Sequence, residues 1–170
     1  MADEKATDEN ATIDNPTDAA AADSDKRIQI TKIYLKDFSF ESPQTPQVFR
    51  IGEWKPKTNL NLRNSHAPIE GDLHEVILTI TVEAKEDEKT LFLVELAQAG
   101  IFEIAGYDKA EYDAIVGSFC PNILFPYARE AIATAIQKGG FPEFVLQPIN
   151  FDALYIQSRQ QAEAQAAESH

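Results

Sequence analysis

The chain contains few of the residues and motifs that enzymes and metalloproteins use. Its only cysteine is Cys120, so no disulfide can form within the chain, and this composition fits a reducing compartment. The three histidines, His66, His74 and His170, lie far apart in the sequence, and none has a second ligand at metal-binding spacing. Phosphate-binding, dinucleotide-binding, zinc-protease and serine-hydrolase motifs are all missing. These absences favour a binding protein over an enzyme and predict no metal or cofactor.

Basic residues and long apolar runs are also scarce. The 170 residues include 15 basic and 28 acidic ones, for a net charge of −13. Nucleic acids and anionic membranes both require basic patches, so this charge argues against either as a partner, whereas a basic polypeptide segment would be attracted. No apolar run approaches the thickness of a bilayer, and the N-terminus carries no apolar signal-peptide core. The sequence therefore predicts neither a membrane span nor secretion.

Composition divides the chain into three regions. Residues 1–25 hold eight acidic residues and one lysine, a net charge of −7, with a single isolated isoleucine. Such a segment cannot bury enough apolar surface to fold, so residues 1–26 are predicted to form a disordered acidic arm. Residues 27–156 are predicted to form one domain. Residues 157–170, rich in Gln, Ala and Glu, are expected to begin as a helix and then to fray.

Alternation of apolar and polar residues predicts an antiparallel sheet in the first part of the domain. Four strands are expected, at residues 28–41, 59–63, 73–85 and 90–99. Strict alternation through the first strand gives two faces. One face would carry Ile28, Ile30, Lys32, Tyr34, Lys36, Phe38 and Phe40, and the other Gln29, Thr31, Ile33, Leu35, Asp37, Ser39 and Glu41.

The fourth predicted strand is apolar on both faces. Phe92, Val94 and Leu96 lie on one face, whereas Leu91 and Leu93 lie on the other. A strand of this kind is normally covered on both sides. The domain's own helix would supply one cover, and the other requires a partner, a second subunit or a ligand.

Residues 117–142 predict a helix built for close packing. Pro121 and Pro126 fall in its first turns, where proline is tolerated, and Gly139-Gly140 end it. The apolar seam expected along this helix consists of Phe125, Ala128, Ile132, Ala135 and Ile136. So wide a surface of small residues suggests that the helix packs against a copy of itself. A short helical piece at 108–116 precedes it, and an extended stretch at 141–149 follows.

Apolar residues without a chemical role gather around a proline-rich loop and on a last helix, which begins near residue 152 and is capped by Asn150 or Asp152. About half of them are expected to be ordinary core. The others predict a groove with a flexible aromatic lip that accepts varied apolar segments. The predicted groove residues are Phe40, Phe49, Trp54, Leu60, Leu62, Leu154 and Tyr155.

Cys120 allows two interpretations. It precedes Pro121 at a predicted helix start, where the helix dipole can lower the pKa of a thiol and favour nucleophilic chemistry. No base is recognisable beside it in the sequence, so a buried structural cysteine is the favoured interpretation. A thiol enzyme would lose its activity in Cys120→Ser.

Four stretches resemble the SecB family of protein-export chaperones: IYLKDFSFESP at 33–43, FLVELAQAGIFEIAG at 92–106, CPNILFPYARE at 120–130 and INFDALY at 149–155. The resemblance covers residues 28–155 but neither the acidic arm nor the last dozen residues. It implies an α+β fold, in which a four-stranded antiparallel sheet is followed by a long packing helix and a short C-terminal helix. It also implies a homotetramer built as a dimer of dimers.

The resemblance further implies roles for individual residues. It ties Phe92, Val94, Leu96 and Gln98 to assembly, to which the helix seam adds Ala128, Ile132 and Ala135. Positions that contact the SecA ATPase in the family fall on Asp37, Glu41, Leu93 and Glu95.

The function implied by the resemblance is that of a cytoplasmic chaperone, not an enzyme, that holds unfolded precursor proteins and delivers them to SecA. The alternative is a SecB-like chaperone dedicated to an antitoxin of a toxin–antitoxin system. The acidic residues at the SecA-contacting positions favour export, because a dedicated chaperone needs no such face.

Overall fold

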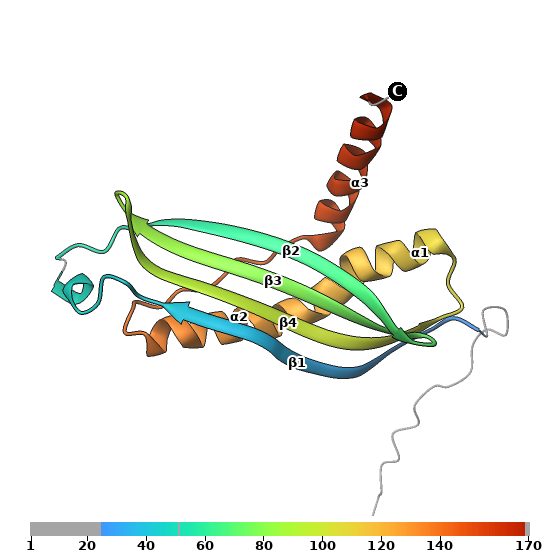
Figure 1. Cartoon of the computed structure of the whole chain (residues 1–170), viewed down its shortest axis with the longest axis horizontal. Helices are drawn as coiled ribbons and strands as arrows, with labels where there is room; N and C mark the ends of the chain where they lie inside the picture. Colours follow the sequence, from blue (N-terminus) through green and yellow to red (C-terminus); the bar gives the residue numbers. More distant parts are fainter. Residues whose placement is uncertain (1–24, 51, 169–170) are drawn as a thin grey trace, which may run out of the picture.

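A computed structural model describes residues 25–50 and 52–168 of the chain. Four strands form one antiparallel sheet: β1 (Arg27–Glu41), β2 (Lys57–Glu70), β3 (Leu73–Glu86) and β4 (Lys89–Ala105). Their order across the sheet is β1-β4-β3-β2, so β1 and β2 form the two edges (Figure 1). Nearly all of the predicted acidic arm lies outside the described residues.

Tight turns link β2, β3 and β4 into a meander, and the last of these strands, β4, also pairs with β1. Gly71 and Asp87 sit in these turns with positive φ angles of 55° and 52°. β2 is much longer than the predicted strand at 59–63, because it stays paired with β3 from Lys57 to Glu70 although its second half is largely polar. Backbone pairing with a central strand compensates for weak local strand preference.

One face of the sheet is covered by the long helix α2 (Cys120–Lys138), which lies behind the sheet in Figure 1 and contacts β4 most extensively. Paired residues of antiparallel strands share a face, so the register assigns every side chain to one side. The even-numbered residues of β3 up to Ala84 and of β4 from Phe92 onward face α2 and form the core with the buried side of the helix. Fully buried members of this core are Val76, Leu78, Ile80, Val82, Val94, Leu96, Phe102, Leu124, Ile132 and Ile136. We call this the inner face of the sheet, and the side without helices the outer face.

Two β-bulges in β1 overturn the strict alternation expected from the sequence. The pairing with β4 skips Thr31 and Lys36, each of which is an extra residue in the strand. Between the bulges the facing of the side chains is therefore inverted. Ile33 and Leu35 pair with Gly100 and Gln98 on the inner face, whereas Tyr34 pairs with Ala99 on the outer face. After the second bulge, the expected facing returns.

The helical part begins where the short helical piece at 108–116 was predicted, and it is nearly continuous. Helix α1 (Lys109–Ala114) starts with a capping box, in which the Asp108 side chain accepts from the Glu111 N–H. A π-helical turn, η2 (Ile115–Phe119), joins α1 to α2.

Pro121 leaves one carbonyl of this π-helical turn without a backbone donor. In π-helical register Pro121 would donate to the carbonyl of Val116, but proline has no N–H. The side-chain amide of Asn64 on β2 donates to that carbonyl instead, at 2.8 Å. The two prolines thus lie within a continuous helical run instead of at its start.

The predicted helix seam faces the chain's own sheet. Phe125, Ala128, Ile132 and Ile136 are buried against the inner face, and only Ala135 of the seam is partly exposed. Ala128 and Ile132 are fully buried within the chain, so their predicted role in assembly, which stays a prediction, would be indirect. The spacing was correctly identified as a packing seam, but spacing alone does not say what the seam packs against. α2 ends at Gly139, and Gly140 has a φ of 85°, as expected for a glycine stop.

The chain then runs in an extended segment to α3 (Phe151–Glu168), which projects from the body of the domain (Figure 1). Asn150 caps α3 by accepting from the Ala153 N–H at 3.0 Å. The base of the helix is held by a hydrogen bond from Ser118 to Asp152 and by an ion pair between Arg159 and Asp113. α3 stays helical to Glu168, so most of the predicted frayed tail is helix, in keeping with its Gln, Ala and Glu content.

Candidate functional site

The outer face brings together the four residues predicted to contact SecA. Glu41 pairs directly with Leu93, and Glu95 and Asp37 occupy neighbouring positions on the same two strands. All four side chains point away from α2, because their positions in the register are those of the outer face. We call Asp37, Glu41, Leu93 and Glu95 the acidic surface.

The carboxylates of the acidic surface are available to a partner. Asp37, Glu41 and Glu95 are exposed, and within residues 25–50 and 52–168 none of the three forms an ion pair. Glu95 accepts only a hydrogen bond of 3.2 Å from the Thr81 hydroxyl. Unpaired carboxylates around a partly buried leucine are suited to a basic segment that also carries an apolar side chain.

A more buried carboxylate lies beside this surface and was not identified from the sequence. The Glu75 side chain, 18% exposed, accepts hydrogen bonds from the Lys36 ammonium at 2.7 and 2.8 Å and from the Tyr34 hydroxyl. These bonds to Lys36 and Tyr34 hold the pKa of Glu75 below its usual range. Burial, together with the bond to Glu75, raises the pKa of Tyr34 to about 12. The sequence gives no signal for this network, because Glu75 reaches it from a strand that does not pair with β1.

On the inner side, three of the predicted client-groove residues meet around a buried phenylalanine. The rings of Phe49 and Trp54 each lie 5.5 Å from the ring of Phe141, and Phe40 lies 6.3 Å from it. Phe92 lies below, 5.0 Å from Phe141 and 6.4 Å from Phe40. We call these five residues the aromatic cluster. Phe49 is 53% exposed, so the cluster has an open margin made of aromatic rings.

Two glycines allow this cluster to form against the end of α2. A Cβ atom at Gly139 would lie 2.3 Å from the Phe40 ring, and one at Gly140 would lie 3.1 Å from the Phe49 ring. Any side chain at Gly139 would therefore displace the ring. The predicted role of these glycines was only to end the helix, and their second role could not be read without the fold.

The remaining predicted groove residues lie at a distance from the cluster. Leu60 and Leu62 are on the inner side of β2, where α2 provides little cover. Leu62 also lines a hollow of about 410 Å³ together with Leu154 and Tyr155 of α3. The predicted groove is thus divided into an aromatic end and an α3 end, with Leu60 and Leu62 between them on the inner side of β2.

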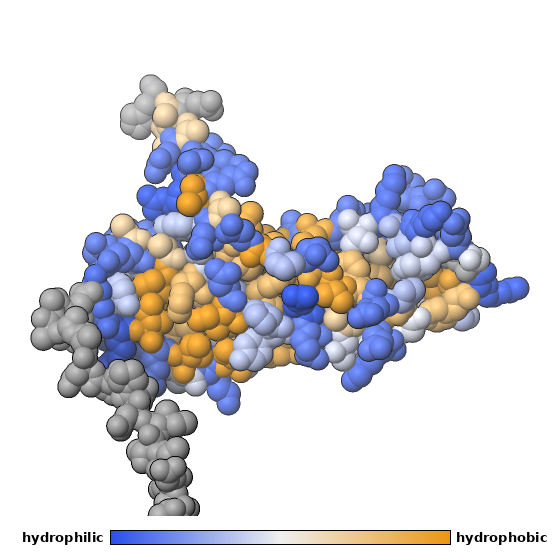
Figure 2. All heavy atoms as spheres, turned by 180° about the vertical axis from the view of Figure 1, so that it is seen from behind, coloured by the Kyte–Doolittle hydropathy of each residue, from blue (hydrophilic) through white to orange (hydrophobic). Residues whose placement is uncertain are grey.

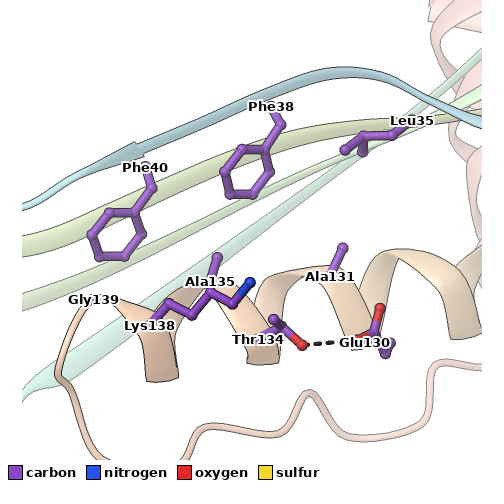
Figure 3. Close-up of a pocket in the computed structure, with 9 residues that line it drawn as sticks. All are labelled: Leu35, Phe38, Phe40, Glu130, Ala131, Thr134, Ala135, Lys138 and Gly139. Carbon is purple, nitrogen blue, oxygen red and sulfur yellow. Dashed lines mark hydrogen bonds between the residues drawn. The ribbon is translucent and has the colours of Figure 1, made fainter.

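A separate groove runs between β1 and α2 (Figure 3). Its volume is about 600 Å³, and its apolar walls are Leu35, Phe38 and Phe40 of β1 and Ala131 and Ala135 of α2. Leu35 is 49% exposed and Phe38 is 39% exposed. Leu35 was predicted to face the opposite side, and the bulge at Lys36 brings it into line with Phe38. We call this the β1–α2 groove.

The residues tied to assembly by resemblance lie beneath this groove and not on the surface. Phe92, Val94, Leu96 and Gln98 are at most 4% exposed, so their predicted role in assembly, which stays a prediction, would be indirect. Instead, Val94 pairs with Phe40, Leu96 with Phe38 and Gln98 with Leu35. They support the three β1 side chains that line the β1–α2 groove.

Further apolar surface lies near the base of α3. Figure 2 views the helix side, where apolar residues form a broad orange area on the half of the molecule that carries α3. Ile28, Ile115, Phe119 and Ile156 line a hollow of about 530 Å³ there. Apolar surface of this extent on the helix side indicates binding to other polypeptides.

The groups considered for chemistry do not form a reactive site. Cys120 is fully buried, and burial raises the pKa of its thiol to about 12, so the thiol stays protonated near neutrality. His74 shares a hydrogen bond of 2.9 Å with the Tyr112 hydroxyl, and burial lowers its pKa. The described part of the chain holds no group of three or more His, Cys, Asp and Glu side chains arranged to bind a metal. None of its helices is long and apolar enough to cross a membrane.

Comparison with known proteins gives a consistent result. Residues 21–162 match the family model described as preprotein translocase subunit SecB. The chain is 52% identical to the protein-export protein SecB of Alcanivorax borkumensis over 150 residues, which cover 86% of this chain and 95% of that protein. It is 51% identical to the protein-export protein SecB of Nitrosococcus oceani over 139 residues, which cover 81% and 85% of the two chains.

Among solved structures, a SecB-like chaperone of Mycobacterium tuberculosis in complex with an antitoxin peptide matches with a TM-score of 0.61. That match covers 72% of this chain and 91% of the other at 16% identity, and shows a common fold. Together with the identity to the curated relatives, the motifs and the four-stranded sheet with its long helix show that this chain belongs to the SecB family of protein-export chaperones.

Proposed function

We propose that this chaperone holds unfolded precursor proteins on its helix side and delivers them to SecA through the acidic surface, in the cytoplasm. The observation that carries the proposal is the separation of two kinds of surface by one sheet. Exposed aromatic and aliphatic side chains lie on the inner side, and unpaired carboxylates lie on the outer face. One protein could therefore bind an apolar client and a basic partner at the same time.

Client binding is best supported by the aromatic cluster and the apolar residues of β2 and α3. Burying one exposed Leu or Phe side chain contributes roughly 1.5–3 kcal/mol, so a few contacts at each end hold an unfolded segment. Unfolded chains expose such side chains, whereas folded proteins bury them. Binding would withdraw the client from folding by mass action. Phe49, Trp54, Leu60 and Leu154 are the exposed or half-buried side chains that we assign to this role.

Assembly into a dimer of dimers is supported by the β1–α2 groove. β1 is an edge strand whose outward backbone groups have no partner strand among the described residues, and apolar side chains line the groove next to it. A second copy placed along β1 would cover Leu35 and Phe38. The buried residues Val94, Leu96 and Gln98 would then affect assembly through the β1 side chains that they support.

A charge reversal on the acidic surface tests the proposal. Glu95→Lys should weaken SecA binding about tenfold at low salt and less at high salt, because salt screens the attraction between exposed charges. Its matched control is Glu143→Lys, a reversal at an exposed residue outside the sheet. Both variants should suppress aggregation of an unfolded client as the parent does. If Glu95→Lys binds SecA normally, the acidic surface is not the SecA site.

The antitoxin-dedicated alternative has less support. The likeness to the Mycobacterium tuberculosis chaperone is at 16% identity and concerns the fold alone. The curated relatives at about 50% identity are protein-export proteins. Exposed, unpaired carboxylates at the SecA-contacting positions also have no use in a chaperone that serves a single antitoxin.

A further inference from the structure

The bulge at Lys36 decides which way the second half of β1 faces. Without this extra residue, Asp37 and Glu41 would follow the inverted facing of Tyr34 and Leu35 and turn toward α2. With it, both acids lie on the outer face, and Phe38 lies on the inner face. In an edge strand, ladder hydrogen bonds hold a bulge from one side only. The position of the bulge therefore also depends on side chains that fix it.

The structure contains such side chains on both faces of the sheet. From the inner face, the buried amide of Gln98 donates to the backbone carbonyl of Tyr34 at 2.9 Å. From the outer face, the Glu75 carboxylate accepts two hydrogen bonds from Lys36 and one from the Tyr34 hydroxyl. Glu75 is on β3 and reaches across β4, a distance of about 10 Å between strand axes, to hold these two residues.

We propose that Glu75 is a positioning residue for partner binding: by holding Tyr34 and Lys36 it fixes the bulge that presents Asp37 and Glu41 to SecA. The inference rests on the proposed role of the acidic surface. Asp37 directly follows the clamped Lys36, so the backbone that carries its carboxylate has little freedom to move while the clamp is intact. A backbone fixed in this way loses less conformational freedom on binding, and preorganisation of this kind raises affinity without adding a contact.

A substitution of Lys36 distinguishes positioning from simple electrostatics, because the two explanations predict opposite changes in SecA affinity. Lys36→Met removes a positive charge from the outer face and makes it more attractive to a basic partner. If charge alone governs binding, the variant should bind SecA more tightly. If the clamp positions Asp37 and Glu41, the variant should bind more weakly in spite of the added attraction.

Lys32 supplies the matched control. It lies on the outer face of the same strand, it is exposed, and no ion pair of Lys32 occurs among the described residues. Lys32→Met therefore makes the same change in charge without touching the clamp.

The experiment measures SecA affinity by titration calorimetry for the two lysine variants, for Tyr34→Phe and for Glu75→Gln, all in the full chain. We expect Lys36→Met to bind about three- to tenfold more weakly than the parent and Lys32→Met to bind equally or slightly more tightly. Tyr34→Phe should give a smaller loss at unchanged charge. In Glu75→Gln the amide oxygen still accepts one bond, so this loss should also be partial.

Hydrogen exchange gives a readout that a change in charge alone would not move. The backbone amides at Lys36 and Asp37 should exchange faster in Lys36→Met and Glu75→Gln and should be unchanged in Lys32→Met. Because Gln98 still holds the Tyr34 carbonyl from the inner face, light scattering should show an unchanged oligomeric state. Equal affinities for Lys36→Met and Lys32→Met would overturn the inference, provided that Glu95→Lys weakens binding. If Glu95→Lys has no effect, the proposed acidic surface itself fails, and the role of Glu75 falls with it.

Discussion

The two faces of the sheet use the same four strands for opposite purposes. The inner face is an apolar layer closed by α2, and its central positions on β3 and β4 are almost completely buried. The outer face carries charged and polar residues among a few half-buried apolar ones. Apolar packing on one side stabilises the fold, and this stability allows the other side to keep unpaired carboxylates that would contribute little to it. Stability and partner recognition can therefore be changed by separate substitutions, except in β1, whose alternate residues serve both faces.

The largest difference in stability is expected between alanine substitutions of two leucines on opposite faces of β4. Leu96 is fully buried on the inner face, and Leu93 is half-buried on the outer face. Leu96→Ala should lower the free energy of unfolding by about 2–5 kcal/mol, because it removes buried methyl groups and leaves a cavity. Leu93→Ala should cost less than about 1 kcal/mol.

Chemical denaturation of both leucine variants, followed by circular dichroism, checks this contrast. The loss of SecA affinity should show the reverse order and be larger in Leu93→Ala than in Leu96→Ala. Both variants are measured under conditions in which they are folded. Equal losses of stability in the two variants would show that the outer face is also covered, as a strand apolar on both faces originally suggested.

A smaller effect is expected where the inner face opens at the end of α2. Gly139→Ala places a methyl group 2.3 Å from the Phe40 ring and should destabilise the protein by about 1–3 kcal/mol through overpacking. The ring cannot move toward Phe92 and Phe141, which are buried, so it should move into the β1–α2 groove. The second change Phe40→Leu removes the far end of the ring and should restore most of the loss.

Trp54 offers a direct measurement for this pair of variants. It is the only tryptophan of the chain and its ring lies 5.5 Å from Phe141, so its fluorescence reports on the aromatic cluster. The emission should shift in Gly139→Ala and return toward that of the parent in the double variant. If Phe40→Leu gives no recovery of stability or emission, the contact between Gly139 and Phe40 is not the cause of the change.

Sequence reasoning predicted the elements well and the contacts between distant elements less well. The strands, the long helix, the glycine stop and the Asn150 cap all follow from local preferences that act over a few residues. Asp37 and Glu41 share a face, as do Leu93 and Glu95, because each pair lies two or four positions apart on a regular part of a strand. Their contact with SecA stays a prediction.

The errors arose where one extra residue or one distant partner decides the outcome. Two bulges invert the facing of Lys32 to Leu35, and nothing in the alternating pattern marks Thr31 or Lys36 as extra residues. The helix seam was recognised, but the surface that it contacts depends on where the sheet lies. Glu75 and Phe141 were missed because their partners come from other parts of the chain.

The smallest effect concerns pH and the hydrogen-bond network around Glu75 on the outer face. The pKa of Glu75 is lowered below its ordinary value of 4.5, chiefly by the hydrogen bond from Lys36 and then by that from Tyr34. A carboxyl group whose pKa is lower in the folded state stabilises the fold above its unfolded pKa, and this contribution disappears as the pH falls through the folded pKa. The free energy of unfolding of the parent should therefore exceed that of Glu75→Gln near neutral pH, and the gap should narrow below about pH 4.5. Glu103→Gln is a suitable comparison, because Glu103 is an outer-face carboxylate that pairs with Arg27 at the far end of β1, away from Lys36 and Tyr34. Urea denaturation of the three proteins between neutral and acidic pH measures the two gaps. A gap that stays constant for Glu75→Gln would mean that the hydrogen bonds from Lys36 and Tyr34 do not stabilise the Glu75 carboxylate in the folded state, and the clamp would then contribute nothing to holding β1.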